Sequence, residues 1–502
     1  MLARLTAAAV FGVEAVPVSV EVDVSPGLPG LTMVGLPDTT VRESRDRVRT
    51  AIRNSGFPFP VDRITVSLAP ADVRKVGAAF DLPIALGVLA ASGVLPARQD
   101  TRFTIVGGLS LDGAVPPMRG LLPIAVAARR ASGALLFPAL NTAEAEVVRD
   151  LRLFPVRSLL EAVQVFVAPE PAPHQPTLQT CTDEASGVDD LRDVRGQFAA
   201  RRALEVAAAG GHHLLFSGPP GVGKTMLARR LPGLLPPLEV DEALMVTSIH
   251  SVAGQLVPGS GLMRRRPFRA PHHTCSDVAL VGGGSVPRPG ELSLAHGGVL
   301  FLDELPEFSR RVLETLRQPV ETGAVHIARA SRSTVFPADI MLVAAMNPCP
   351  CGYWGTGQRP CRCAAGAIAR YRGRLSGPLR DRFDVALEIP AVSWAEMREG
   401  GHGEDSAAVR GRVVDARARQ LSRQGRLNGR LEGDELERVC AVADAGTVRL
   451  LKGAVEKFRL SARAVTRVLR VSRTLADLAG CEGLSAAHVA EALQFRVPDA
   501  AT

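Results

Sequence analysis

The stretch from His213 to Thr225, His-Leu-Leu-Phe-Ser-Gly-Pro-Pro-Gly-Val-Gly-Lys-Thr, decides the fold of the region around it. An apolar strand leads into the pattern Gly-x4-Gly-Lys-Thr, and a helix is expected to follow over Met226–Leu231. Glycines let the backbone curl so that successive N–H groups point at a phosphate, and the helix N-terminus adds partial positive charge. The pattern therefore predicts a phosphate-binding loop made of Gly218, Pro219, Pro220, Gly221, Val222, Gly223, Lys224 and Thr225.

Four residues have predicted roles in binding ATP and its metal. Lys224 is expected to reach the outer phosphates, and the Thr225 hydroxyl is expected to be a ligand of Mg²⁺. Further along, the apolar strand Gly298–Leu302 delivers Asp303 and Glu304 at its carboxyl end, where open α/β sheets bind ligands. We expect Asp303 to hold Mg²⁺ through its water shell and Glu304 to polarise the attacking water.

A third apolar strand, Ile340–Ala345, is followed by Asn347. An amide at this strand tip can sense the terminal phosphate and position the water, although an Asn-Pro pair often only starts a turn. The three strand tips together predict an ATPase. Continuous apolar strands between helices predict a parallel sheet buried on both faces, so the fold class is α/β, with this core expected over residues 191–392.

The chain on either side of this core has a different pattern. Residues 169–190 are rich in Pro, Ser, Thr and acids without an apolar period, which is typical of an exposed linker. Short β-rich runs and helical stretches alternate before it, and the pattern is helical from about residue 405, so residues 1–168 are predicted to be an α/β or α+β domain and 393–502 a helical bundle. The predicted N-terminal strands are 16–24, 63–68 and 103–107, and the predicted helices are 41–54 and 82–91.

Composition limits the class of protein. The 502 residues include 46% hydrophobic and 22% charged residues, which is a globular composition and excludes a disordered chain. The net charge of +8 suits a polyanionic partner such as nucleic acid without proving one. Aromatic residues make up only 4%, so base-stacking platforms are not expected to dominate any nucleic-acid contact.

Neither a secretion signal nor a membrane span is expected. The N-terminal apolar run is interrupted by Glu14 and continues in strand-like alternation to Val24, which predicts a first strand. The longest apolar stretch, Phe80–Leu95, contains Asp81 and Pro83, so it is not expected to cross a membrane. We therefore expect a cytoplasmic protein without a membrane partner.

Four of the eight cysteines, Cys349, Cys351, Cys361 and Cys363, form a Cys-x-Cys…Cys-x-Cys pattern in a glycine-containing loop. Four thiolates so close in sequence could wrap one tetrahedral Zn²⁺. The Cys-x-Cys spacing is tighter than the usual Cys-x2-Cys, so reduced structural cysteines and a redox switch remain alternatives.

Four motifs are long enough to point to a family: PFRAPHHTCSDVALVGGG (267–284), PGELSLAHGGVLFLDELPEF (289–308), AAMNPCPCGYWG (344–355) and SGPLRDRFD (376–384). They resemble the ComM/YifB family of Mg-chelatase-like AAA+ ATPases, and the similarity covers essentially the whole chain. The resemblance implies an AAA+ P-loop core with a helical lid, assembled into a hexameric ring with ATP between neighbours. It also implies that Arg382 is the arginine finger reaching the next subunit's γ-phosphate and that Arg463 is the second sensor, contributed by the lid. A surface salt bridge is the alternative for either arginine.

The function implied by the resemblance is ATP-driven motion on forked or branched DNA, without sequence preference. It would be a helicase or branch-migration activity in natural transformation or recombination. The alternative is a chelatase-type ATPase that remodels a partner enzyme to insert metal into a tetrapyrrole. The fused N-terminal domain, and the lack of an integrin-like metal-binding segment in the sequence, argue against the chelatase.

Arginines mark two candidate DNA contacts. In related ring ATPases the corresponding insertions project into the central channel, where arginines would bind phosphates without reading sequence. The alternative for the first group is pairing with acids of the adjacent subunit. The two groups are Arg264, Arg265, Arg266 and Arg269 in an insertion, and Arg329 and Arg332 in a candidate hairpin over 324–335.

Residues 1–168 resemble the Lon-protease-like, ribosomal-S5-like α+β domain of the same family. In active Lon a serine follows a glycine-rich stretch, and a lysine on a later helix deprotonates it. Here the serine position falls within Ala78–Asp81, which has no hydroxyl, and the later helix Leu121–Ala131 has no lysine. Lys75, the only lysine of the domain, is expected to face solvent or DNA. We therefore expect no peptide hydrolysis, and a domain that binds DNA or stabilises the ring.

Overall fold

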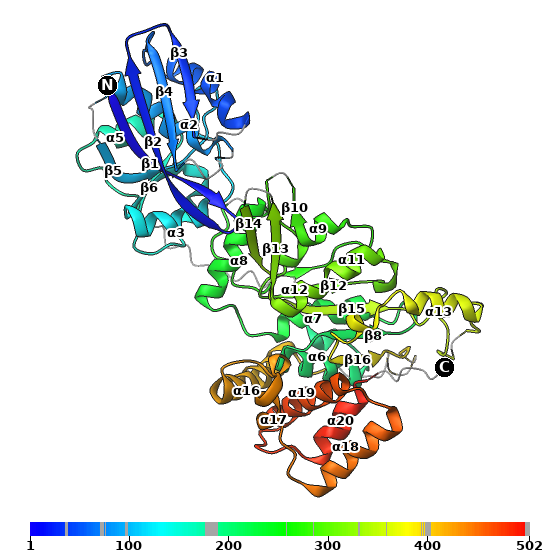
Figure 1. The fold of residues 1–502 in the computed structure, drawn as a ribbon. Coiled ribbons are helices and arrows are strands. Elements are labelled where there is room, and N and C mark those ends of the chain that lie inside the picture. The colour runs from blue at the N-terminus through cyan, green and yellow to red at the C-terminus, as the bar shows by residue number, and fades with distance from the viewer. Residues whose placement is uncertain are drawn as a thin grey trace.

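Figure 1 shows the computed structural model of the chain, an elongated molecule in three parts. An N-terminal sheet domain lies at one end, a parallel-sheet core in the middle and a group of helices at the other end. The structure describes residues 1–35, 39–70, 75, 77–95, 99–175, 189–257, 259–284, 286–329, 332–357, 359–392, 394, 396 and 403–496.

The N-terminal domain is built on a seven-stranded mixed sheet with the order β3-β4-β2-β1-β5-β6-β7. A long antiparallel hairpin of β1 and β2 forms its centre, so the first 25 residues are two strands where the sequence predicted one. The strands are β1 (Leu2–Phe11), β2 (Glu14–Ser25), β3 (Gly30–Val34), β4 (Arg63–Ala69), β5 (Gln99–Ile105), β6 (Ala134–Pro138) and β7 (Arg152–Val156). The helices are α1 (Thr39–Asn54), η1 (Ala78–Phe80), α2 (Asp81–Ala91), α3 (Leu121–Ala131), η2 (Ala139–Asn141), α4 (Thr142–Ala145) and α5 (Leu159–Val167).

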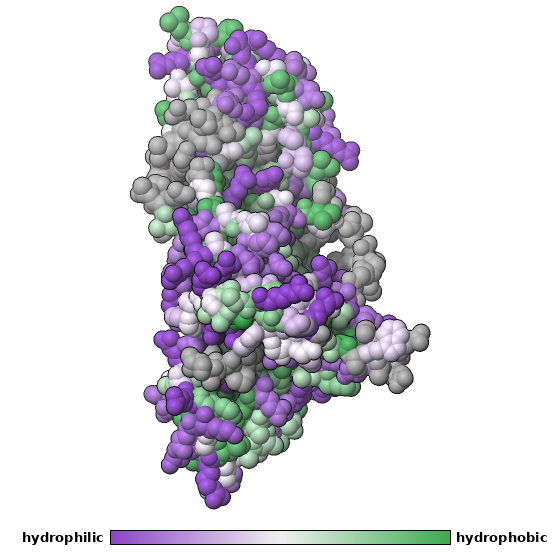
Figure 2. All heavy atoms as spheres, turned by 90° about the vertical axis from the view of Figure 1, so that its right-hand side faces the viewer, coloured by the Kyte–Doolittle hydropathy of each residue, from purple (hydrophilic) through white to green (hydrophobic). Residues whose placement is uncertain are grey.

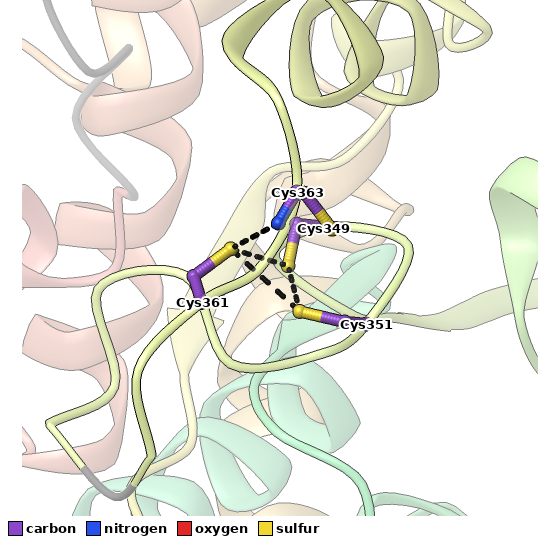
Figure 3. A group of neighbouring side chains, drawn as sticks. All are labelled: Cys349, Cys351, Cys361 and Cys363. Carbon is purple, nitrogen blue, oxygen red and sulfur yellow. Dashed lines mark hydrogen bonds between the residues drawn. The ribbon is translucent and has the colours of Figure 1, made fainter.

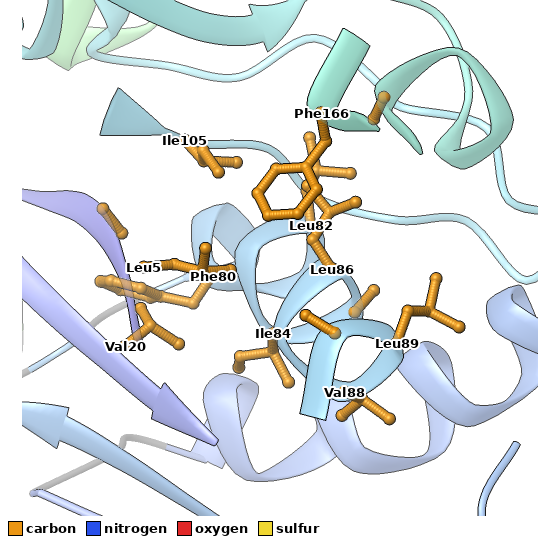
Figure 4. Packing of buried hydrophobic residues seen from close by; sticks show 14 of the residues in the cluster. Leu5, Val20, Phe80, Leu82, Ile84, Leu86, Val88, Leu89, Ile105 and Phe166 are labelled. Atoms are coloured by element: carbon orange, nitrogen blue, oxygen red, sulfur yellow. The ribbon is translucent and has the colours of Figure 1, made fainter. Parts of the chain in front are cut away.

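Helix α2 forms the centre of this domain's hydrophobic core. All of its residues are buried, as expected of a helix that is apolar all round. Figure 4 shows Leu82 and Leu86 near Phe166 of α5, with Phe80 at the start of the helix facing Leu5 and Val20 of the sheet. The helix that the sequence predicted over 82–91 is thus confirmed, and its burial explains why so apolar a stretch does not need a membrane.

One expectation for the N-terminal domain is wrong. Lys75 is fully buried, and its ammonium donates a hydrogen bond to the backbone carbonyl of Pro70. It therefore faces neither solvent nor DNA. A lysine is expected at the surface by default, and nothing in the sequence signalled a carbonyl partner five residues away.

The middle of the molecule is a five-stranded parallel sheet with the order β16-β8-β15-β12-β9. All residues of β12 and β15 are buried, which confirms the predicted parallel sheet covered on both faces. Because the strands run in the same direction, their carboxyl ends lie at one edge. The strands are β8 (Leu214–Ser217), β9 (Phe268–Arg269), β12 (Val299–Leu302), β15 (Met341–Met346) and β16 (Val385–Glu388).

Helices and two small hairpins surround this sheet. The hairpin predicted over 324–335 is confirmed as β13 (Ala324–Arg329) paired with β14 (Arg332–Pro337). The remaining elements are η3 (Leu191–Asp193), α6 (Phe198–Gly210), α7 (Lys224–Leu234), α8 (Val240–Ala253), α9 (Asp277–Val281), β10 (Gly282–Gly283), β11 (Arg288–Pro289), α10 (Glu291–Leu294), η4 (Leu305–Glu307), α11 (Arg310–Thr315), α12 (Arg317–Thr322), α13 (Ala365–Gly373) and α14 (Gly377–Arg380).

The C-terminal helices pack on the α6 side of the sheet and share one hydrophobic cluster with it. A buried polar contact joins the two parts: His212 lies 3.0 Å from an Asp384 carboxylate oxygen through Nδ1 and 2.8 Å from the Thr474 hydroxyl through Nε2. The elements are α16 (Ser406–Gln424), η5 (Asn428–Arg430), α17 (Gly433–Val439), α18 (Ala445–Phe458), α19 (Ala462–Leu478) and α20 (Ala486–Gln494).

The N-terminal domain contacts the core mainly through α8 and the β13–β14 hairpin. The Ser251 hydroxyl of α8 donates to the buried Glu144 carboxylate, and Gly120 N–H donates to the Ser251 carbonyl at 3.2 Å. The β1–β2 turn lies against β14, so closely that a Cβ at Gly12 would be 2.9 Å from Thr334 Cγ2. The predicted linker begins with an anchored segment, because His174 lies 2.7 Å from a Glu146 carboxylate oxygen; residues 176–188 are outside the described part.

Candidate nucleotide site

The phosphate loop joins β8 to α7 at the carboxyl edge of the parallel sheet. Gly221 and Gly223 adopt left-handed φ angles of 81° and 89°, which glycine accepts without strain. Gly218 has no room for a side chain, because a Cβ there would be 2.4 Å from the Ile389 carbonyl oxygen. Its N–H donates to the Met346 carbonyl at 3.2 Å, so the loop is fixed to the end of β15.

Lys224 is buried within this loop. Its ammonium donates to the carbonyls of Gly218 and Pro219 at 2.7 and 2.9 Å and to Asn347 Oδ1 at 3.0 Å. Burial lowers the pKa of Lys224, and the charges of two carboxylates nearby oppose that shift. The structure therefore brings together the predicted phosphate-binding lysine and the predicted sensor amide.

The predicted metal ligands also meet. Thr225 Oγ1 donates to Asp303 Oδ2 at 2.6 Å, so a hydroxyl and a carboxylate lie side by side at the start of α7. Oxygen donors of this kind are the ligands Mg²⁺ prefers, and the pair fits an ion that would also hold phosphate oxygens and water. Glu304 follows in a left-handed conformation, with φ 51°, and its N–H donates to Asp303 Oδ1 at 2.9 Å.

One neighbour of Glu304, His273, was not predicted from the sequence. His273 Nδ1 lies 3.3 Å from a Glu304 carboxylate oxygen, and its ring lies 4.1 Å from that of His272 and 6.4 Å from that of Phe308. In the sequence, the His272-His273 pair appears only within the family motif over residues 267–284. His273 follows β9, a strand too short to show an apolar run. The sequence therefore did not indicate that His273 lies near the carboxyl edge of the sheet.

The two arginines implied by the resemblance have partners outside the phosphate loop. Arg382 donates to Glu321 at 2.6 Å, and its Nε is buried without a hydrogen-bond partner among the described residues. Arg463, at the start of α19, is three-quarters exposed and 3.8 Å from Asp381. Neither contacts Lys224 or Thr225 in any contact that the structure describes.

Arg467 of α19 ties the segment around Arg382 to the lid. It is mostly buried, and its guanidinium donates to Asp381 at 2.8 Å and to the Phe383 carbonyl at 3.1 Å. One lid residue therefore holds the chain on both sides of Arg382.

The six arginines predicted to contact DNA fall into three groups. Arg266 is mostly buried and donates to the carbonyls of Pro236 and Gly297 at 2.7 Å, while Arg269 forms a two-bond pair with Glu291 at 2.7 and 2.8 Å. Both are therefore engaged within their own chain. Arg264 and Arg265 are exposed, and Arg329 and Arg332 end the two strands of the hairpin, where only the backbone is described. Hydrophilic residues are numerous over the middle of the face in Figure 2.

The four cysteines of the Cys-x-Cys pairs converge to one point, as Figure 3 shows. All four sulfur atoms lie within 4.8 Å of one another, with Cys349 buried and the others partly buried. Backbone N–H groups of Arg362 and Tyr353 lower the pKa of the Cys351 thiol to about 6. Four cysteine sulfur atoms that converge on one point are a donor set that fits a tetrahedral zinc ion.

The described helices include none that is both long and apolar enough to cross a membrane. Three family models match the chain: "Magnesium chelatase, subunit ChlI" over residues 190–397, "Subunit ChlI of Mg-chelatase" over 20–141 and "Magnesium chelatase, subunit ChlI C-terminal" over 403–496. The second match lies in the N-terminal domain, so the presence of that domain does not argue against a chelatase.

Relatives extend the match to full length. The chain is 45% identical to the uncharacterized protein YifB of Salmonella typhimurium and 46% identical to the competence protein ComM of Haemophilus influenzae, in both cases over 99% of this chain and 97% of the relative. A Holliday junction branch migration complex subunit, RuvB of Saccharopolyspora erythraea, is 26% identical over 60% of this chain and 73% of its own length.

Proposed function

We propose that this chain, which belongs to the YifB/ComM family of Mg-chelatase-like AAA+ ATPases, is an ATP-driven motor that acts on DNA as a hexameric ring. The observation that carries the proposal is the division of the nucleotide site. Lys224, Thr225 and Asn347 converge in one chain, whereas Arg382 lies elsewhere on the same chain with a buried, unpartnered nitrogen among the described residues.

We call Lys224, Thr225, Asp303, Glu304 and Asn347 the phosphate edge of the site, and these residues have distinct roles in hydrolysis. Lys224 holds the outer phosphates, and Thr225 and Asp303 hold Mg²⁺, which neutralises charge on the phosphate oxygens when bound. Asn347 orients the attacking water, and Glu304 accepts a proton from it. The water oxygen bonds to the γ-phosphorus as the bond to the bridging β–γ oxygen breaks, and ADP and phosphate are the products.

We call Arg382 and Arg463 the arginine edge, which completes the nucleotide site of a neighbouring subunit. Arg382 would leave Glu321 and neutralise charge on the γ-phosphate held by the next subunit, with Arg463 beside it from the lid. This requirement for two subunits couples hydrolysis to assembly of the ring.

DNA as substrate is supported by the charge and by the relatives. The net charge of +8 favours a polyanion. One relative is named a competence protein and another a subunit of a Holliday junction branch migration complex. We propose that forked or branched DNA is bound without sequence preference by Arg329 and Arg332 of the hairpin, and by Arg264 and Arg265 of the preceding insertion.

A strand-exchange assay on a labelled Holliday junction tests the motor. The wild-type protein should move the junction with ATP, and Lys224→Ala should bind the junction without moving it. ATPase stimulated by junction DNA supports the motor. ATPase that ignores DNA, and responds instead to a large chelatase partner, would favour metal insertion into a tetrapyrrole, which the chelatase family models keep as the second candidate.

The hairpin contact has its own test. Arg329→Ala with Arg332→Ala should lower DNA affinity and reduce the slope of log affinity against log salt by about 2, because each phosphate contact contributes about 1. Arg370→Ala, on the exposed face of α13, is the matched control. Unchanged DNA affinity in the double variant would remove the hairpin from the proposed interface, while basal ATPase should be unaffected.

We also propose that the four-cysteine cluster binds one structural Zn²⁺. Metal analysis of the purified protein should find about one zinc per chain, released together with four titratable thiols. Less than about half an equivalent, with all four thiols freely titratable, would leave the cysteines as reduced structural residues.

A further inference from the structure

We propose that the four-cysteine metal site positions the ATP site: metal bound there fixes the loop from Cys349 to Cys363 against the phosphate loop and the sensor residue, so that ATP binding and hydrolysis depend on it. The inference rests on the proposed zinc site and goes beyond it, because a structural zinc could equally serve a region without contact to the nucleotide.

The first link between the two sites runs through the chain itself. Asn347 is the first residue after β15, and the first cysteine of the cluster, Cys349, follows two residues later. Asn347 Oδ1 accepts a hydrogen bond from Lys224 at 3.0 Å, whereas Cys349 is fully buried and lies 3.4 Å from Cys351 Sγ and 3.7 Å from Cys361 Sγ. A metal at the cluster therefore fixes the backbone immediately after the sensor.

The second link is direct packing on the phosphate loop. Gly352 N–H donates to the Cys349 carbonyl at 2.9 Å, which closes a tight turn inside the cluster. The turn presses against Pro220 so closely that a Cβ at Gly352 would be 2.6 Å from Pro220 Cδ and 3.8 Å from Pro220 N. Pro220 is one of the residues that shape the phosphate loop, so the cysteine loop forms part of its wall.

The third link is made by helix α13, which follows the cysteine loop in sequence. Helix α13 begins shortly after Cys363, and the Tyr371 hydroxyl on that helix lies near the Asn347 backbone, which opposes the rise that burial causes in the pKa of Tyr371. Burial raises the pKa of Tyr371 to about 12, so the hydroxyl stays protonated. The Arg372 guanidinium lies 4.6 Å from the Trp354 ring, which ties the same helix to the middle of the cysteine loop.

A bound metal would be a strong constraint on the shape of this loop. The described residues between Cys349 and Cys363 form turns and irregular backbone without a helix or strand. A tetrahedral zinc would close a loop of this length on itself, which removes much of its conformational freedom. Without the ion, four thiols within 4.8 Å of one another have no bond that keeps Gly352 against Pro220.

Two glycine variants separate the packing contact from backbone strain. Gly352 and Gly355 have similar left-handed φ angles of 85° and 76°, but a Cβ at Gly355 meets nothing within 4 Å. We expect Gly352→Ala to keep its zinc yet bind a fluorescent ATP analogue more weakly and hydrolyse ATP about tenfold more slowly, because small displacements of a positioned site cost this much. Gly355→Ala should match the wild type in both measurements.

Removal of the metal gives the second arm. Cys361→Ser, or zinc withdrawn from the wild-type protein by a chelator, should produce the same loss of nucleotide binding, and zinc returned to the chelated protein should restore it. Cys481→Ser, at an exposed cysteine of the lid, is the control. Circular dichroism and a melting curve of each sample show whether the fold persists.

The outcomes distinguish the inference from the zinc proposal. If the wild-type protein holds no zinc, even after incubation with the ion, both fall together. If zinc is bound, but Gly352→Ala and the zinc-free protein bind and hydrolyse ATP like the wild type, the zinc site stands and the positioning role is wrong.

Discussion

The two edges of the nucleotide site differ in how far one chain completes them. At the phosphate edge, Lys224 is already bonded to Asn347 and Thr225 to Asp303, so the polar groups hold one another in place. At the arginine edge, Arg382 is paired with the exposed Glu321 and keeps a buried nitrogen without a partner among the described residues. The phosphate edge is preorganised within the chain, whereas in the proposed ring a second subunit would replace the pairing of Arg382 with Glu321.

The variant expected to have the largest effect is Arg382→Ala, which tests the arginine edge. We expect ATP turnover to fall ~10³-fold or more, the range measured for arginine fingers. ATP binding should remain, because the phosphate edge is complete without Arg382. Steady-state ATPase and nucleotide titration measure both, with Arg370→Ala as the surface control. Loss of ATP binding together with turnover would show that the two edges are not separate.

Glu304→Gln should break the phosphate edge alone. We expect turnover to fall ~10²- to 10⁴-fold, because the amide cannot accept the proton of the attacking water. Nucleotide binding and ring assembly should persist, as measured by titration and by mass photometry.

Mixing the two inactive variants sharpens the comparison. If Arg382 acts on a neighbour, a ring of Arg382→Ala and Glu304→Gln subunits contains sites with an intact Glu304 from one chain and an intact Arg382 from the next. Part of the ATPase should therefore return on mixing. If Arg382 served its own chain, no combination would restore a complete site, and the mixture would stay inactive.

Arg467→Ala tests whether the lid supports the arginine edge. Removing the bonds that Arg467 donates to Asp381 and to the Phe383 carbonyl should lower the free energy of unfolding by about 1–3 kcal/mol, since both acceptors lose their partner. Turnover should fall with it, and Arg467→Lys should recover stability better than turnover because an ammonium cannot hold both partners in the same geometry. Arg463→Ala, at a three-quarters exposed residue, should leave the melting temperature unchanged. A melting temperature of Arg467→Ala equal to that of the wild type would contradict the supporting role of Arg467.

The smallest expected effect is at His273. Its contact with Glu304 is half exposed on the carboxylate side, and such pairs contribute about 0.2–1 kcal/mol. We expect His273→Ala to raise the basal ATPase about two- to fivefold by releasing Glu304, and to weaken its stimulation by DNA. His272→Ala is the matched control, since its ring nitrogen contacts Thr274 instead. Basal turnover that falls in His273→Ala would show that the contact assists catalysis.

Much of this site could be predicted because its signals are local. A phosphate loop is formed by consecutive residues, so its pattern can be recognised in the sequence. Asp303 and Asn347 each follow an apolar run, and both runs end at the same edge of the sheet. The helical pattern from about residue 405 was expected, and helices α16 to α20 confirm it. Strands β9 and β16 were missed, because two to four residues with polar ends show no apolar run.

The missed contacts join residues far apart in sequence. Arg266 and Arg269 were expected to reach DNA, and instead bind carbonyls and a glutamate brought close by the insertion's fold. His212, a histidine beside a glycine turn, gave no sign that it would lie between Asp384 and Thr474. Partner choice for a polar side chain depends on tertiary geometry, which neither composition nor periodicity records.

His212 has a mechanical consequence for a ring built from this chain. Sheet and lid share one hydrophobic cluster and are fastened by this enclosed imidazole, so the pair should behave as a single stiff unit during turnover. The N-terminal domain has one large hydrophobic cluster of its own and meets the core at contacts that include Glu144, Ser251 and Gly12. Relative motion is therefore expected where the N-terminal domain meets the core, while the core and the lid move together.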